Sequence, residues 1–155
     1  MFDLVIRDAS IVDGTGAPAV RGDLAVSGGR IAAIGRGLGP ARETMDAGGL
    51  TLMPGIIDGH THYDAQLTWD AWADPSALQG VTTVVIGNCG FTIAPCRPAD
   101  RDLTMRNLTH VEGMSLDALR TGVRWEFEQF GEYLGMLERR GVGPNVAAFA
   151  GHSSI

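Results

Sequence analysis

The chain has 155 residues, of which 45% are hydrophobic and 19% are charged, and its net charge is −6. It has no long apolar run and no basic patch, which argues against a membrane span and against a nucleic-acid partner. The N-terminus lacks the positively charged start of a signal peptide, so we expect a cytoplasmic location. Two cysteines in a chain of this length do not make a disulfide framework.

Short β-strands are predicted before position 53. Residues 2–7 alternate between apolar and polar side chains, which is the pattern of a half-buried strand. Gly28-Gly29 separates the stretches 23–27 and 30–34 and predicts a hairpin, because glycine tolerates the positive φ angles of a tight turn. A polar stretch and one more short apolar run follow before Pro54.

Beyond Pro54, apolar runs alternate with helical patterns. The expected strands are 56–58, 81–86 and 145–150, and the expected helices are 74–80, 100–110 and 126–140. This alternation favours β/α units on a parallel sheet. Four apolar residues of the last helix recur at helical spacing and are expected in the core: Phe127, Phe130, Leu134 and Leu137.

The most informative motif is Asp58-Gly59-His60-Thr61-His62. Residues two apart on a strand point to the same side, so His60 and His62 can converge on one ion. Neutral imidazole is a ligand that suits Zn²⁺. A chance pair of surface histidines is the alternative, but the short apolar strand in front of the motif favours a metal site, because barrels place active sites at strand ends. We expect Asp58 to support the histidines rather than to bind the ion.

Two segments carry a family resemblance. Residues 54–62, Pro-Gly-Ile-Ile-Asp-Gly-His-Thr-His, are similar to the signature of the amidohydrolase superfamily. Residues 80–90, which end in Asn-Cys-Gly, resemble the second-strand region of the D-aminoacylases, or N-acyl-D-amino-acid deacylases. The resemblance implies that His60, His62 and Cys89 bind the metal. Taken alone, Cys89 would read as an inert buried thiol, whereas a thiolate in this setting can replace the carboxylated lysine of many relatives.

The resemblance extends over essentially the whole chain and implies an α/β fold in two parts. Residues 1–53 would form the N-terminal portion of a small β-sandwich. Residues 54–155 would form about three β/α units of a metal-dependent (β/α)₈ TIM barrel, which takes about 250 residues when complete. The chain is therefore expected to be an incomplete N-terminal piece, with a degenerate remnant as the alternative.

The resulting hypothesis is a hydrolase that cleaves the amide bond of N-acyl-D-amino acids and holds one or two zinc ions in each complete site. The family's catalytic aspartate is expected downstream, so this segment alone should be inactive. Another amidohydrolase, such as a cyclic amidase or a deaminase, and a non-catalytic scaffold are the alternatives. Among the remaining candidates, His152 is a substrate contact, Cys96 is structural and His110 is solvent-exposed. Substrate side-chain preference and oligomeric state stay open.

Overall fold

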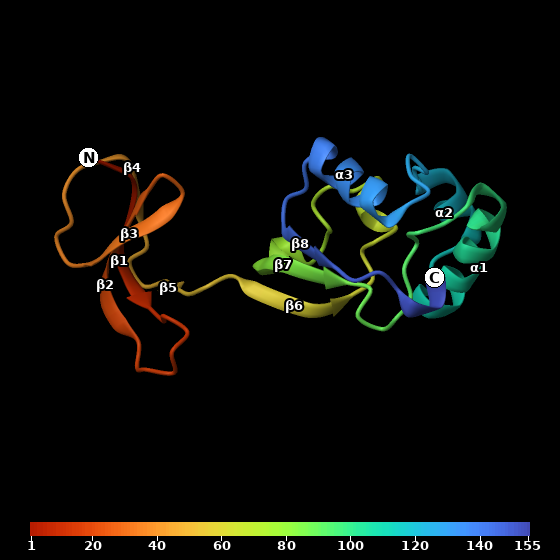
Figure 1. Cartoon of the computed structure of the whole chain (residues 1–155). Coiled ribbons are helices and arrows are strands. Elements are labelled where there is room, and N and C mark those ends of the chain that lie inside the picture. Colours follow the sequence, from red (N-terminus) through yellow and green to blue (C-terminus); the bar gives the residue numbers. More distant parts are fainter. The chain divides into compact units, whose positions relative to one another are not determined.

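The computed structural model describes all 155 residues, and each of its two units, Met1–Pro54 and Gly55–Ile155, contains one β-sheet (Figure 1). The observed fold is mixed α/β, as expected from the sequence. No helix combines the length and the apolar character that crossing a membrane requires.

The first unit is a five-stranded sheet. Its strands are β1 (Phe2–Ile11), β2 (Val20–Ser27), β3 (Arg30–Gly35), β4 (Ala41–Asp46) and β5 (Thr51–Leu52). The order is β3-β2-β1-β4, with β5 also paired to β1. The hairpin between β2 and β3 is confirmed, and Gly28 and Gly29 have φ angles of 58° and 71°. The strand β4 was not predicted, because most of its residues are polar, and all but Ala41 are exposed.

Asp23 on β2 joins three parts of the first unit. Its carboxylate accepts hydrogen bonds from the backbone N–H of Asp8 at 3.0 Å and of Leu38 at 3.3 Å. The Arg7 guanidinium donates a third, at 3.0 Å. These donors, led by the Asp8 N–H, hold the pKa of Asp23 below its usual value. The ionised carboxylate therefore stabilises this sheet.

We expect the first unit to lose stability in acid through Asp23. Its folded-state pKa lies below the unfolded value of 3.8, so its contribution is complete above that pH and is lost as the pH falls through the folded pKa. In Asp23→Asn the first sheet should be less stable at neutral pH and should lose this acid dependence. Amide hydrogen exchange of β1 and β2 measures both effects. Glu43→Gln, a change at an exposed residue of β4, is the control. An unchanged acid dependence in Asp23→Asn would contradict the assignment.

The second unit contains a parallel sheet, as predicted, but no α-helix lies between its first two strands, so the expected β/α alternation is confirmed only in part. The sheet consists of β6 (Ile56–Thr61), β7 (Val81–Ile86) and β8 (Asn145–Ala148), in that order. Its helices are α1 (Arg101–Glu112), α2 (Leu116–Gly122) and α3 (Phe130–Arg140), and its short 3₁₀ turns are Gln66–Thr68, Ala77–Gln79, Pro98–Asp100 and His152–Ser154. Figure 1 shows α3 over the sheet, whereas α1 and α2 lie beyond the ends at which β6 and β7 point.

Two helix predictions need correction, and one helix was missed. The helix expected over 74–80 is only a 3₁₀ turn that ends at Gly80, whose φ of 88° is left-handed. The helix α2 was not predicted. The last helix begins at Phe130 rather than at Glu126, because the carboxylate of Glu132 accepts the backbone N–H groups of Glu128 and Gln129 and thereby caps the helix there.

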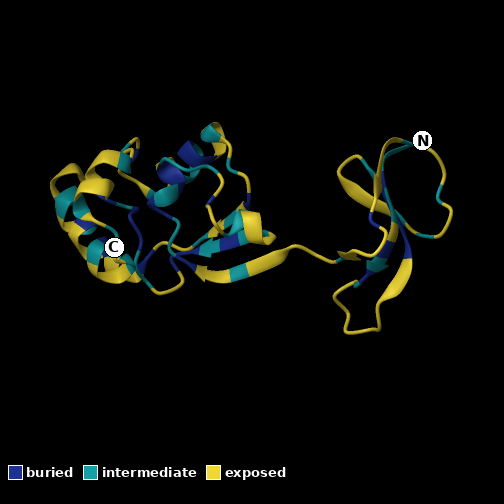
Figure 2. Cartoon of the chain, turned by 180° about the vertical axis from the view of Figure 1, so that it is seen from behind, coloured by how far each residue is buried: buried dark blue, intermediate teal, exposed yellow.

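The core of the second unit lies between the sheet, the helices and the long loop after β7. Its largest fully buried apolar side chains include Tyr133, Leu67, Ile86, Ile93, Leu108 and Leu119. The predicted apolar stripe is confirmed, since Phe127 and Leu137 are buried and Phe130 and Leu134 pack against the core. The strand β6 is largely exposed along its length (Figure 2), and Ile57 is 69% exposed.

Candidate metal centre

The candidate ligands gather where β6 and β7 end. His60 is near the end of β6, His62 follows that strand directly, and Cys89 lies three residues after β7. Because the two strands are parallel neighbours, their carboxyl ends meet at one edge of the sheet. Two side-chain bonds tie this edge together: the Thr61 hydroxyl donates to the carbonyl of Val85 at 3.0 Å, and the Asn88 amide donates to the carbonyl of Gly59 at 2.9 Å.

The structure brings His60, His62 and Cys89 into one cluster. One ligand atom from each lies within 4.8 Å of the other two. The two imidazole rings are 5.4 Å apart between centroids, and the sulfur of Cys89 lies 4.0 Å from Nδ1 of His62. Two imidazoles and a thiolate are the donors that zinc favours, and three protein ligands leave a coordination position for water or substrate. The donor set therefore fits a catalytic zinc ion.

The turn after β7 directs Cys89 toward the histidines. It begins at Gly87, whose φ of 79° is left-handed, and a Cβ atom there would lie 2.5 Å from the carbonyl oxygen of Phe149. Only glycine fits both conditions without strain. The sulfur of Cys89 then accepts the backbone N–H of Phe91 at 3.4 Å. Local backbone chemistry thus holds the thiol in place before any metal binds.

Asp64 links the loops that carry the candidate ligands. Its buried carboxylate accepts the backbone N–H of Ile93 at 2.8 Å, and the hydroxyl of Tyr133 donates to the backbone carbonyl of Asp64 at 2.9 Å. Burial raises the pKa of Asp64 to about 6, although the N–H of Ile93 opposes the rise. The link joins the loop after His62 to the loop after Cys89.

The other two predicted site residues lie outside the cluster. Asp58 is on β6, and its carboxylate accepts the backbone N–H of His60 at 3.3 Å, so it contacts the main chain rather than an imidazole ring. His152 is exposed at the start of the last 3₁₀ turn, next to Gly90 in the loop that follows Cys89. The structure shows no hydrogen bond from either side chain to the side chains of His60, His62 and Cys89.

Glu112, at the end of α1, is a neighbour of the cluster that the sequence analysis missed. Its Oε1 atom lies 2.8 Å from Nδ1 of His62. Burial raises the pKa of Glu112, and the charges of His62 and His60 oppose the rise. No sequence signal pointed to it, because it is far along the chain from the motif and α1 approaches the histidines only in the folded protein.

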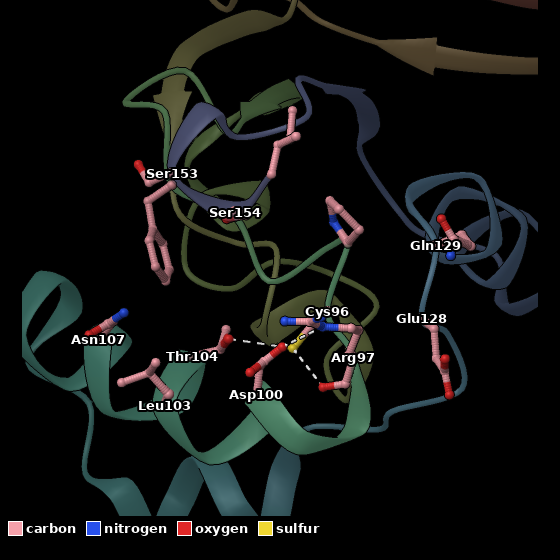
Figure 3. Close-up of a pocket in the computed structure, with 13 residues that line it drawn as sticks. Cys96, Arg97, Asp100, Leu103, Thr104, Asn107, Glu128, Gln129, Ser153 and Ser154 are labelled. Carbon is pink, nitrogen blue, oxygen red and sulfur yellow. Dashed lines mark hydrogen bonds and ion pairs between the residues drawn. The ribbon is translucent and has the colours of Figure 1, made fainter.

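A cavity of about 480 Å³ is lined by residues other than the candidate metal ligands (Figure 3). Its wall includes Phe91, Cys96, Leu103 and Thr104, and none of His60, His62 and Cys89 lines it. Cys96 is buried, with its sulfur 3.4 Å from the hydroxyl of Thr104. That packing is what a structural cysteine shows.

Comparisons with known proteins agree on one family. Residues 43–155 match the model of the amidohydrolase family. The chain is 39% identical to D-aminoacylase of Alcaligenes xylosoxydans xylosoxydans over 155 residues, covering 99% of this chain and 30% of the relative. A crystal structure of D-aminoacylase matches 99% of this chain and 30% of its own with a TM-score of 0.80 and 36% identity.

A second solved structure adds a metal and an inhibitor. It is N-acyl-D-glutamate deacylase from Bordetella bronchiseptica, complexed with zinc and a phosphonate inhibitor that mimics the tetrahedral intermediate of the reaction. It matches 99% of this chain and 30% of its own, with a TM-score of 0.74 and 37% identity. The chain therefore spans about 30% of the length of the relatives it matches.

Proposed function

Since this chain belongs to the amidohydrolase family, we propose that it is the N-terminal part of a zinc-dependent deacylase that hydrolyses the amide bond of N-acyl-D-amino acids. The observation that carries the proposal is the convergence of His60, His62 and Cys89 at the ends of two parallel strands. Its similarity to D-aminoacylase over the whole chain supports this substrate class.

The three side chains have distinct tasks in this proposal. His60 and His62 offer neutral imidazole nitrogens, and Cys89 offers a negatively charged thiolate, which lowers the net charge of the centre. Zinc bound there supplies Lewis acidity toward the amide carbonyl and toward water. The exposed positions of His60 and Cys89 leave the centre open to a substrate from solvent. Asp58 orders the backbone of His60, and His152 is proposed as a substrate contact at the rim.

The rest of the site belongs to the whole protein. We propose that residues 1–53 contribute to a small β-sandwich, and that residues 54–155 supply the first three β/α units of a (β/α)₈ barrel. A catalytic aspartate from a later strand would take the proton that water releases, a role that typically contributes about 10²–10⁴-fold to the rate. The expected cytoplasmic location stays a prediction, as does the number of zinc ions.

The test is an amide-hydrolysis assay of the full-length protein. N-acetyl-D-amino acids with apolar and acidic side chains, and their L enantiomers, are offered as substrates, and the release of free amino acid is measured. We expect hydrolysis of at least one D substrate with preference over its L form, loss of turnover after treatment with a chelator, and recovery on addition of zinc.

Two results would contradict the proposal. Turnover that persists after complete removal of metal would exclude the zinc mechanism. Hydrolysis of cyclic amides, with none of the N-acyl-D-amino acids accepted, would assign the protein to another branch of the amidohydrolases.

A further inference from the structure

A carboxylate oxygen of Glu112 contacts one of the candidate metal ligands, His62. Its Oε1 lies 2.8 Å from Nδ1 of His62, and the two side chains are only 19% and 21% exposed. The Oε1 atom is itself buried and makes no aligned hydrogen bond. A buried carboxylate oxygen is costly unless a donor satisfies it. The imidazole of His62, 2.8 Å away, can do so after a small rotation of either side chain.

The position of Glu112 in α1 makes this contact informative. Glu112 is the last residue of the helix, which stops because Gly113 adopts a left-handed φ of 66°. The C-terminal end of a helix carries partial negative charge, so a carboxylate is unfavourable there unless a cation or a donor faces it. The arginines Arg106 and Arg120 both pair with Asp102, and the only ion-pair partner of Glu112 is His62.

The contact decides which nitrogen of His62 is free to bind a metal. An ionised carboxylate only accepts hydrogen bonds, so a neutral imidazole opposite it carries its proton on Nδ1 and its lone pair on Nε2. Ligating histidines are oriented in this way by carboxylates in many zinc proteins. We propose that Glu112 is a positioning residue: its carboxylate holds the Nδ1–H group of His62, the nitrogen that also lies 4.0 Å from the sulfur of Cys89, and leaves Nε2 to bind zinc. This inference rests on the metal centre of the proposed function.

Zinc affinity of the full-length protein tests the inference without relying on activity. Zinc binding to the wild type, Glu112→Ala and Glu112→Gln is measured by competition with a chromophoric chelator. We expect Glu112→Ala to weaken zinc binding about 10–100-fold, as removal of an outer-shell partner does. Glu112→Gln should lose less, because its amide oxygen still accepts the Nδ1–H group. Glu138→Ala and Glu138→Gln, at an exposed residue of α3, are matched controls with no expected effect.

A cobalt-substituted protein separates positioning from direct ligation. The visible spectrum of Co²⁺ reports its ligand set, so at saturating Co²⁺ the spectra of Glu112→Ala and the wild type should coincide. A changed spectrum at saturation would make Glu112 a ligand and overturn the inference.

Two further outcomes would overturn it. Zinc affinity of Glu112→Ala within twofold of the wild type would do so and leave the proposed function intact. A wild-type protein that binds no zinc would overturn both. Amide exchange of the metal-free variants checks the fold. If α1 opens in Glu112→Ala but not in Glu112→Gln, only Glu112→Gln is used for the comparison. In that case, a zinc affinity of Glu112→Gln no weaker than that of Glu138→Gln overturns the inference.

Discussion

Replacing Cys89 by alanine in the full-length protein is expected to remove zinc and to lower kcat/KM for deacylation by more than about 100-fold, beyond the usual effect of an outer-shell change. The substitution takes away one of only three candidate ligands in this segment. It is the only one that binds zinc as an anion, because cysteine ligates metals as the thiolate. Serine should not rescue the loss, because its hydroxyl does not ionise as readily as a thiol. Metal content and steady-state kinetics measure the two effects separately.

Cys96 provides the matched control for this experiment. It is the other cysteine of the chain and is buried against Thr104, away from the cluster. Cys96→Ala should therefore keep its zinc and its kcat/KM and cost only some stability through a small cavity. A Cys89→Ala protein with the zinc content of the wild type would remove Cys89 from the metal centre.

The largest effect on stability is expected from Leu108→Ala. Leu108 lies in α1 and is completely buried in the core of the second unit. Truncating a buried leucine to alanine removes apolar contacts and leaves a cavity, which typically costs about 2–5 kcal/mol of unfolding free energy. Because α1 also carries Glu112, a loosened helix should weaken zinc binding as well. Amide hydrogen exchange of α1 in the metal-free protein measures the local free energy of opening.

Leu103 is the control on the same helix. It is 60% exposed, so Leu103→Ala should change stability by no more than about 0.5 kcal/mol. Equal effects of the two substitutions on exchange in α1 would show that Leu108 does not anchor the helix to the core.

Many of the strands and turns could be predicted from the sequence. Strands with β-branched runs, such as 81–86, and the Gly28-Gly29 hairpin follow from short-range sterics, and the structure confirms both. The strand β4 and the helix α2 were missed. The polar residues of β4 carry no alternation, and its partner β1 lies far away in the sequence. Pairing between distant segments leaves no local pattern to find.

The candidate site also has a part that the sequence predicts and a part that depends on the tertiary structure. The spacing of His60 and His62 is a property of one strand, so the sequence by itself determined that the two imidazoles share a side. That Cys89 joins them depends on the pairing of β6 with β7, and that Glu112 reaches His62 depends on the packing of α1. Neither distance is encoded in the spacing along the chain. Only tertiary structure decided them, because burial of residues such as Leu108 brings the end of α1 to the metal centre.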